Sequence, residues 1–343
     1  MGGVHAYGRG ERERGEAGPA RLTAALAGAG VSWEQVAGCR SLAGGTFNAV
    51  HLVGLADGTK LVVKIPPDPA VPVLRYERGI LATEALYYQL AGRCRGVTVP
   101  VVVAVDAIGE AGGYLVMTQC PGSPWPELTP LPSGGERDEL RAELGRQVAC
   151  LHTITGTGFG YPSQVLGPLR DSWRAAFLGM VDAVLADAGR FAVTLPRSAA
   201  EVRELFAAQA AVLDEVTTPV LVHFDLWDGN ILVESGSAGC RIGALIDAER
   251  AFWGDPLAEF VSLALFADIE QDTAFLRGYR AAGGMVTFDL AARRRLSLYR
   301  AYLYLIMWVE AVPRQSSKKR RDWLLDVVFG PMAAIFDEWS PHQ

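Results

Sequence analysis

The chain has 343 residues, a formal net charge of −6 and a hydrophobic fraction of 50%. This is enough apolar material for a sizeable core, which excludes global disorder. Gly and Pro show no three-residue period, which excludes collagen. The acidic balance argues against a nucleic-acid binder, because such proteins usually carry net positive charge.

The five cysteines are scattered and form no C-x-x-C pair. A zinc cluster is therefore not expected, and reduced thiols in a cytoplasmic protein are. Residues 1–20 lack the apolar run of a secretion signal, and no segment approaches the ~18 apolar residues of a membrane span. We expect a cytoplasmic monomer or homodimer with no nucleic-acid or membrane partner.

Residues 1–18 are rich in Gly, Arg and Glu and are predicted to be a disordered leader. Ala and Leu at helical spacing predict a short helix at 21–30. Asp57-Gly58 between two β-rich runs is a strong hairpin signal. Apolar residues close to a 3.6 period predict a helix at 75–90. The expected strands are 48–55, 60–65, 100–105 and 114–117.

A stretch rich in Pro and Gly at 120–132 predicts a linker, and mostly helical patterns follow it. Short strands and loops return between 220 and 246. The predicted fold class is α+β, with a small antiparallel β-sheet N-lobe carrying one helix (19–118) and a larger, mainly α-helical C-lobe (119–343). The hinge is expected at about 118–122. The helices expected in the C-lobe are 136–152, 172–188, 199–215, 257–282 and 287–338.

The sharpest motif runs from 222 to 232 and has the form H-x-D-x-x-x-x-N, with an apolar run on each side. Such runs place the loop between two buried strands, so that Asp225 and Asn230 converge on one site. The carboxylate can accept a hydroxyl proton and the amide oxygen can hold a metal. The alternative is a polar turn in which both side chains cap the backbone.

A second acidic position, Asp247, stands at the end of an apolar run at 244–246. A carboxylate leaving a buried strand is costly unless it is paired or binds a metal. Mg²⁺ needs only one or two carboxylates in addition to substrate phosphates, and Asp247 with Asn230 would supply them. The alternative is a helix cap or a surface aspartate.

Lys64 lies in the middle of the apolar strand 61–65. Burying an ammonium group is expensive without a counter-charge, and Glu84 on the predicted helix is the expected partner. Such a pair would aim the lysine at a phosphate. Glu77 is a weaker alternative partner, and a lysine that reaches solvent from an edge strand is the structural alternative.

Gly44, Gly45 and Thr46 lie in the strand-rich region that begins at about residue 36, just before the predicted strand 48–55, where glycines allow backbone N–H groups to approach phosphate. A Gly-Gly turn is common in any hairpin, so this signal is weak alone. The chain contains no G-x-x-x-x-G-K-[ST], which rules out a P-loop enzyme. It also lacks a G-x-G-x-x-G after a strand and a G-x-S-x-G elbow, which disfavours Rossmann enzymes and α/β-hydrolases.

The order of these segments resembles the aminoglycoside phosphotransferase family, which is choline-kinase-like and has a protein-kinase-like fold. Three further segments are similar to that family: its hinge at 115–122, its helix ending in Leu-His at 144–152, and its Gly-Asp-Pro segment at 254–260. The resemblance covers about residues 36–310. A protein kinase proper is disfavoured, because neither Asp-Phe-Gly nor Ala-Pro-Glu follows the catalytic loop.

The resemblance implies binding of ATP, with GTP as the alternative, and of Mg²⁺. It makes Asp225 the catalytic base or the residue that orients the acceptor hydroxyl. Asn230 and Asp247 become the metal ligands, and Lys64, oriented by Glu84, the contact to the nucleotide phosphates. His223 would support the catalytic loop, and Asp255 would brace it or cap the next helix. The remaining residues implied at the nucleotide are Gly44, Gly45, Thr46, Met117, Thr118 and Cys120.

Three positions depart from the family pattern: Phe224 replaces a usual Gly, Trp227-Asp228 replaces a commoner His-Pro, and Glu259 stands where Asp is frequent. The departures leave Asp225, Asn230 and Asp247 intact but weaken any transfer of substrate identity.

The expected reaction is phosphorylation of a hydroxyl on a small molecule, and an aminoglycoside or related amino-sugar antibiotic is the first expectation for the acceptor. Residues 119–343 hold 21 basic and 28 acidic residues, a net of −7 that suits a cationic acceptor. The alternatives are a fructosamine, homoserine, choline or macrolide kinase, or a catalytically silent nucleotide-binding protein. The candidate acceptor contacts are Trp227, Asp228, Asp268, Glu270 and Glu310.

Overall fold

The computed structural model describes residues 18–42, 47–107, 113–237 and 239–340. The predicted leader, apart from residue 18, and the glycine-rich positions Gly44, Gly45 and Thr46 therefore lie outside the described residues. Within these ranges, no helix combines the length and the apolar character needed to span a bilayer.

The N-terminal part is an antiparallel sheet of five strands, in the order β1-β2-β3-β5-β4. Asp57 and Gly58 form the predicted hairpin, with Gly58 at a φ of 89° and Thr59 N–H donating to Asp57 Oδ1 at 2.8 Å. The strands are β1 (Val36–Ser41), β2 (Ala49–Leu55), β3 (Lys60–Ile65), β4 (Val102–Asp106) and β5 (Tyr114–Thr118).

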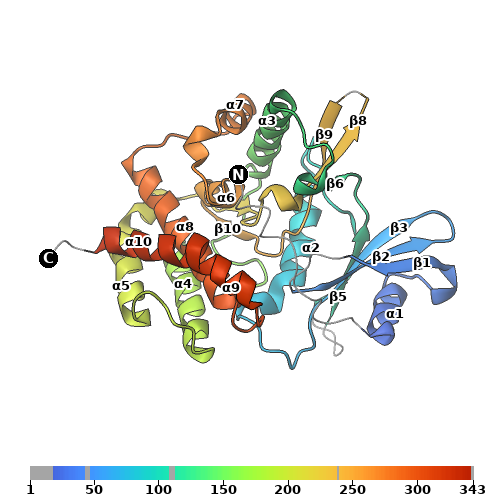
Figure 1. The fold of residues 1–343 in the computed structure, drawn as a ribbon, viewed down its shortest axis with the longest axis horizontal. Helices are drawn as coiled ribbons and strands as arrows, with labels where there is room; N and C mark the ends of the chain where they lie inside the picture. Colours follow the sequence, from blue (N-terminus) through green and yellow to red (C-terminus); the bar gives the residue numbers. More distant parts are fainter. Residues whose placement is uncertain (1–17, 43–46, 108–112, 238, 341–343) are drawn as a thin grey trace.

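Helices cover both faces of this sheet. Helix α1 (Pro19–Gly28) packs on one face, where Leu22 and Leu26 form a small core with strand residues such as Val63. Helix α2 (Ile80–Ala91) packs on the other face and faces the rest of the molecule (Figure 1). It starts later than the predicted residue 75, because Tyr76–Gly79 forms a 3-10 turn first. The predicted antiparallel sheet with one inserted helix is confirmed.

The C-terminal part is mainly helical, as predicted. Serine N-caps begin four of its helices, and Ser133 and Ser198 form capping boxes with Glu136 and Glu201. Its helices are α3 (Gly134–Leu151), α4 (Trp173–Arg190), α5 (Ala199–Gln209), α6 (Glu259–Leu263), α7 (Thr273–Ala281), α8 (Leu290–Glu310), α9 (Lys318–Leu324) and α10 (Gly330–Trp339). The segments expected to be helical at 257–282 and 287–338 are each divided by turns into shorter helices.

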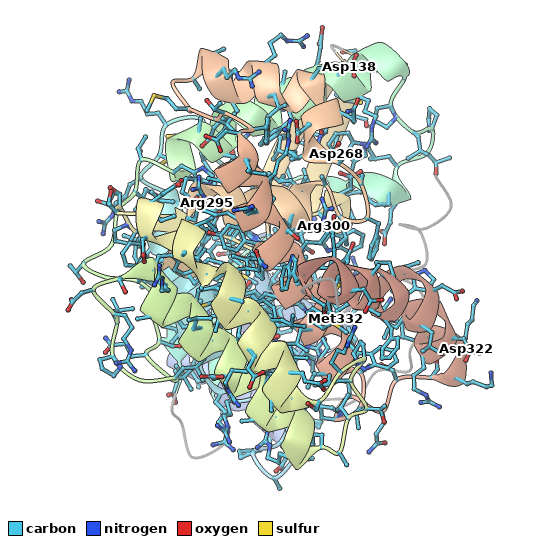
Figure 2. The ribbon with its side chains drawn as sticks, turned by 90° about the vertical axis from the view of Figure 1, so that its left-hand side faces the viewer. Asp138, Asp268, Arg295, Arg300, Asp322 and Met332 are labelled. Carbon is cyan, nitrogen blue, oxygen red and sulfur yellow. The ribbon has the colours of Figure 1, made fainter. Side chains whose placement is uncertain are left out.

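Helix α8 is the central support of this part, since Tyr299 and Tyr302 are fully buried in the main core. Figure 2 looks onto the helical end, where Arg295 and Arg300 of α8 lie below Asp268. The Arg300 guanidinium donates to the backbone oxygen of Ala267 beside it at 3.4 Å. The loop at 264–272 is thus held against α8.

Short strands flank the H-x-D-x-x-x-x-N motif. Strand β7 (Val220–Val222) pairs with β10 (Phe252–Gly254), and β8 (Ile231–Gly236) pairs with β9 (Gly239–Leu245), all antiparallel. The loop between β7 and β8 carries Asp225 and Asn230, and Asp247 follows β9. Residues 120–132, predicted as a linker, also contribute β6 (Ser123–Pro124), which pairs with β8.

Candidate active site

Lys64 bridges the two parts of the molecule. Its Nζ lies 2.6 Å from Glu84 Oε1 on α2 and 2.5 Å from Asp247 Oδ1 after β9. Burial by itself would lower the pKa of Lys64, but the carboxylates of Asp247, Glu84 and Glu249 raise it above its ordinary value. The lysine therefore stays charged in a buried position. Glu77, the alternative partner, instead binds Arg314 at 2.6 Å.

Tyr88 is a site residue that the sequence did not reveal. Its hydroxyl donates to Glu84 Oε1 at 2.6 Å and accepts from the Asp247 N–H at 2.8 Å. Asp247 has a φ of 66°, a left-handed conformation that is costly for a non-glycine residue. Tyr88 thus helps to fix the backbone from which the Asp247 carboxylate projects. Its one visible signal is its place one helical turn after Glu84.

The side chain of Asn230 folds back onto the loop that carries Asp225. Its Nδ2 donates to the backbone oxygen of Asp225 at 2.7 Å. The amide oxygen of Asn230 has the opposite polarity and is the atom suited to a metal.

His223 supports the same loop from beneath. Its Nε2 lies 3.0 Å from Ile246 O, and its Nδ1 accepts from the Asp225 N–H at 3.3 Å. Burial lowers the pKa of His223 to about 4, so the imidazole is neutral near pH 7. Its hydrogen bonds are those of a supporting residue, since both ring nitrogens bind backbone groups.

Glu259, rather than Asp255, braces the loop that carries Asp225 and Asn230. Glu259 is fully buried and accepts from the His223 N–H at 2.7 Å and the Phe224 N–H at 3.1 Å. Asp255 instead caps the following turn through the Leu257 N–H at 2.9 Å and accepts from the Tyr299 hydroxyl at 2.7 Å. The bracing expected of Asp255 is therefore wrong, and the alternative of a helix cap is right.

Asp225 is 9% exposed and lies beside Arg250, whose Nη1 is 3.4 Å from Asp225 Oδ1. Burial raises the pKa of Asp225 to about 7. Arg250 opposes this rise, and the carboxylates of Asp247 and Glu310 add to it. A carboxyl group with a pKa close to the working pH is suited to proton transfer. Arg250 carried no signal in the sequence, because a lone arginine in a loop is unremarkable.

These groups open into a cleft of about 630 Å³ between the sheet and the helical part. Met117, Thr118 and Cys120 line the wall that follows β5, and Lys64, Asp225, Asn230 and Asp247 line the interior. Glu84 lies behind Lys64. The Thr118 N–H donates to Val101 O at 2.9 Å, so this donor is used within the sheet. A nucleotide would have to use other backbone groups of that wall.

The predicted acceptor contacts are only partly brought together. Trp227 and Glu310 line the cleft. Asp228 lies outside the lining and pairs with Arg141 and Arg137 at 3.4 and 3.3 Å. Glu270 pairs with Arg293 at 2.8 Å, and Asp268 accepts from the Glu270 N–H at 2.9 Å. The positions of Asp228, Asp268 and Glu270 do not support contact with a molecule in this cleft.

The residues present fit a divalent cation. Carboxylate oxygens of Glu84, Asp247 and Glu249 lie within 4.8 Å of one another. Burial, together with Asp247, raises the pKa of Glu249 well above its ordinary value, and this crowding of like charges is what a cation would relieve. Glu249, two residues after Asp247, carried no functional signal of its own in the sequence. Its Oε2 accepts from Asn48 Nδ2 at the start of β2, at 2.9 Å.

Solved structures with this fold span almost the whole chain. A fructosamine-3-kinase candidate from Thermobifida fusca YX-ER1 has a TM-score of 0.60 at 23% identity, covering 91% of this chain and 99% of its own. A thermostable mutant of aminoglycoside phosphotransferase APH(4)-Ia, solved with AMP-PNP and hygromycin B, has a TM-score of 0.60 at 19% identity, covering 94% of this chain and 99% of its own. Macrolide 2′-phosphotransferase MphH from Brachybacterium faecium has a TM-score of 0.57 at 21% identity, covering 94% of this chain and 99% of its own.

At these sequence identities, the three structural similarities establish the fold. They confirm the protein-kinase-like architecture expected from the sequence. No curated protein matches the chain in sequence. The family assignment comes from the sequence profile of the APH group, described as the phosphotransferase enzyme family, which matches residues 38–299. This match covers well over half of the chain and includes Lys64, Asp225 and Asp247. The chain belongs to the phosphotransferase enzyme family.

Proposed function

We propose that the protein is an ATP- and Mg²⁺-dependent kinase that transfers the γ-phosphoryl group to a hydroxyl of a small molecule. The observation that carries this proposal is the position of Lys64. It is clamped between Glu84 and Asp247 on one side of a cleft that also holds Asp225 and Asn230. This is the charge arrangement that phosphoryl transfer needs: a cation for the phosphates, oxygen ligands for a metal and a carboxylate for the acceptor.

In the proposed reaction, Asp225 accepts the proton of the acceptor hydroxyl. The hydroxyl oxygen forms a bond to the γ-phosphorus, the bond from that phosphorus to the β,γ-bridging oxygen breaks, and ADP leaves with the electron pair. The raised pKa of Asp225 makes its carboxylate a stronger base than an exposed aspartate. Asp225 also holds the acceptor oxygen in line with the phosphorus, which is the larger contribution in such reactions.

Lys64 would neutralise phosphate oxygens of the nucleotide, and Glu84 would keep it oriented. Asn230 and Asp247 would hold the metal, with Glu249 beside them; when bound, Mg²⁺ supplies charge neutralisation at the phosphates. Met117, Thr118 and Cys120 would line the base pocket. Gly44, Gly45 and Thr46 are proposed to cover the phosphates with their backbone N–H groups. GTP is the alternative nucleotide.

For the acceptor, we propose an aminoglycoside or related amino-sugar antibiotic, with Trp227 as an aromatic wall for a sugar ring. The acidic balance of residues 119–343 supports it. Within the cleft, part of this negative charge is compensated, because the Glu310 carboxylate pairs with Arg250 and Arg314. A macrolide or fructosamine acceptor is therefore the second candidate, since neither requires a strongly acidic pocket.

The test is ADP release from Mg-ATP in the presence of aminoglycosides, aminocyclitols, macrolides, fructosamines, choline and homoserine. Stimulation by one class, lost in Asp225→Asn, would establish the reaction and the acceptor class. Asp182→Asn is the matched control, because this half-exposed aspartate on α4 forms a surface ion pair with Arg203, away from the cleft. Full turnover in Asp225→Asn would contradict the proposal, and binding of ATP without turnover would point to a silent nucleotide-binding protein.

A further inference from the structure

A chain of buried charges ends on Asp225. Arg250 is 3% exposed, and its Nη2 lies 2.9 Å from Glu310 Oε2 and 3.1 Å from Glu310 Oε1. Glu310 is the last residue of α8 and is 5% exposed. Both residues line the cleft. The catalytic-loop carboxylate is thus connected through one arginine to the end of the central helix.

The contacts of Arg250 with Glu310 and with Asp225 differ in length, and therefore in strength. Charge-assisted hydrogen bonds between nitrogen and oxygen are about 2.7–2.9 Å long. The Arg250–Glu310 contact has this length, at 2.9 Å, whereas the Arg250–Asp225 contact is 3.4 Å long. The ion pair of Arg250 with Glu310 is therefore stronger than its contact with Asp225.

Glu310 is itself held from the other side. Arg314, one helical turn further along the chain, places Nη2 at 3.2 Å from Glu310 Oε2 and at 2.6 Å from Glu77 Oε1. The Glu310 carboxylate thus lies between two guanidinium groups, which fixes its position. A carboxylate in this arrangement is poorly suited to bind a cationic acceptor, because its charge is already compensated.

We infer that Glu310 is a positioning residue that restrains Arg250 and so keeps the Asp225 carboxylate available to the acceptor hydroxyl. This inference rests on the proposed function, in which Asp225 binds that hydroxyl. Planar guanidinium and carboxylate groups pair through two parallel hydrogen bonds when nothing prevents it. Without Glu310, Arg250 would pair with both oxygens of Asp225, and Asp225 could no longer accept the proton of the acceptor hydroxyl.

The decisive experiment is a double-mutant cycle with Glu310→Gln and Arg250→Gln. Glu310→Gln is expected to lower kcat by about 10- to 100-fold, the effect of misplacing a reacting group, while KM for the acceptor changes by less than about twofold. Arg250→Gln in the same chain is expected to restore kcat at least about tenfold, because the residue that blocks Asp225 is then absent. A merely structural role predicts further loss in the double mutant.

Glu77→Gln is the matched control, because it removes another buried carboxylate from Arg314 but leaves Arg250 with Glu310. It is expected to lower stability without a comparable loss of kcat. If Glu310→Gln folds poorly, Glu310→Asp replaces it, since the shorter carboxylate also releases Arg250. A rise in acceptor KM with unchanged kcat in Glu310→Gln would overturn the inference and make Glu310 an acceptor contact.

A structural measurement separates this inference from the proposed function. In a crystal structure of Glu310→Gln, the distance from Arg250 Nη1 to Asp225 is expected to shorten from 3.4 Å to about 2.9 Å, with a second hydrogen bond to the other oxygen. An unchanged distance would overturn the inference even if the wild-type protein is an active kinase. A shortened distance in a protein that phosphorylates none of the acceptors would retain the restraint of Arg250 and reject only the proposed function.

Discussion

The hydroxyl of Tyr88 accepts a hydrogen bond from the backbone N–H of Asp247 at 2.8 Å, across 159 residues of sequence. The same hydroxyl donates to Glu84 Oε1 at 2.6 Å. Helix α2 therefore holds both the partner of Lys64 and the backbone of the proposed metal ligand. The arrangement makes the position of Asp247 depend on a helix from the other part of the molecule.

Tyr88→Phe should consequently weaken metal binding. The change removes the partner of the Asp247 N–H, and a buried donor without a partner costs about 1–3 kcal/mol. Asp247 then has less to hold it at its positive φ. We expect the Mg²⁺ concentration for half-maximal activity to rise several-fold at saturating ATP.

Tyr87→Phe is the control for this measurement. The Tyr87 hydroxyl is buried on the same helix and has no hydrogen-bond partner among the described residues. It should leave the Mg²⁺ dependence unchanged. An equal effect of the two substitutions would contradict the role given to Tyr88.

The rate of phosphoryl transfer should depend on pH through Asp225. Its pKa is raised to about 7, so the carboxyl is protonated at lower pH and cannot accept a proton. We expect kcat/KM to fall about tenfold per pH unit below pH ~7 and to level off above it. A profile measured from pH 5 to 9, with stability verified at each pH, tests this.

Arg250→Gln should shift the pH profile in a predictable direction. Arg250 opposes the rise in the pKa of Asp225, so its removal should move the acidic limb to higher pH. A flat profile between pH 6 and 8 in the wild-type protein would contradict the assignment of Asp225 as the base.

Glu259→Gln should destabilise the catalytic loop. The Glu259 carboxylate accepts two backbone N–H groups, whereas a carboxamide offers one acceptor oxygen and an NH₂ group that repels the second donor. Because the substitution weakens hydrogen bonds to a buried charged group, the free energy of unfolding should fall by about 3 kcal/mol. The value of kcat should fall as well. Urea unfolding and steady-state kinetics measure the two effects.

Glu234→Gln serves as the comparison, because Glu234 forms an ion pair with the exposed Arg241. Its loss should cost less than about 1 kcal/mol. Similar losses of stability in the two variants would show that Glu259 does not brace the loop.

Phe224 should tolerate glycine better than alanine. Its φ is 61°, which favours glycine, yet its ring is fully buried against Phe252 and Tyr302. Phe224→Ala should cost about 3–5 kcal/mol through the cavity, and Phe224→Gly about 1 kcal/mol less, since glycine relieves the backbone.

The opposite order is expected at Phe252, which lies in β10 without a positive φ. There, glycine should be the worse of the two substitutions, by about 0.5–1 kcal/mol. If alanine is the better residue at 224 as well, backbone strain does not explain why glycine is usual in the family at this position.

Much of the fold was predictable, because it depends on local signals. The hairpin at Asp57-Gly58 and the strand 60–65 match the structure, since turn chemistry and β-rich runs act over a few residues. The helix expected at 75–90 was misplaced at its start, where a 3-10 turn packs Tyr76 against Tyr161. Contacts with the helical part decided that boundary, and the segment's own periodicity does not contain them.

The domain limits, the glycine-rich loop at 44–46 and the roles of the site residues remain predictions. The structure adds their spatial arrangement: Lys64, Asp225, Asn230 and Asp247 line one cleft, Glu84 lies behind Lys64, and Asp268 and Glu270 lie elsewhere. The acidic character of the second half of the sequence suggested several acceptor contacts. In the structure, most of those carboxylates pair with arginines.

The sequence by itself determined the fold class and the order of the chemical groups, because spacing within a loop or strand fixes which groups can converge locally. Only the tertiary structure decided that Glu259 braces the loop, that Tyr88 holds Asp247 and that Glu310 holds Arg250. These contacts join residues 36, 159 and 60 positions apart. Glutamate, tyrosine and arginine are common everywhere in a chain, and they acquire a role only when folding buries them beside one another and removes water as a partner.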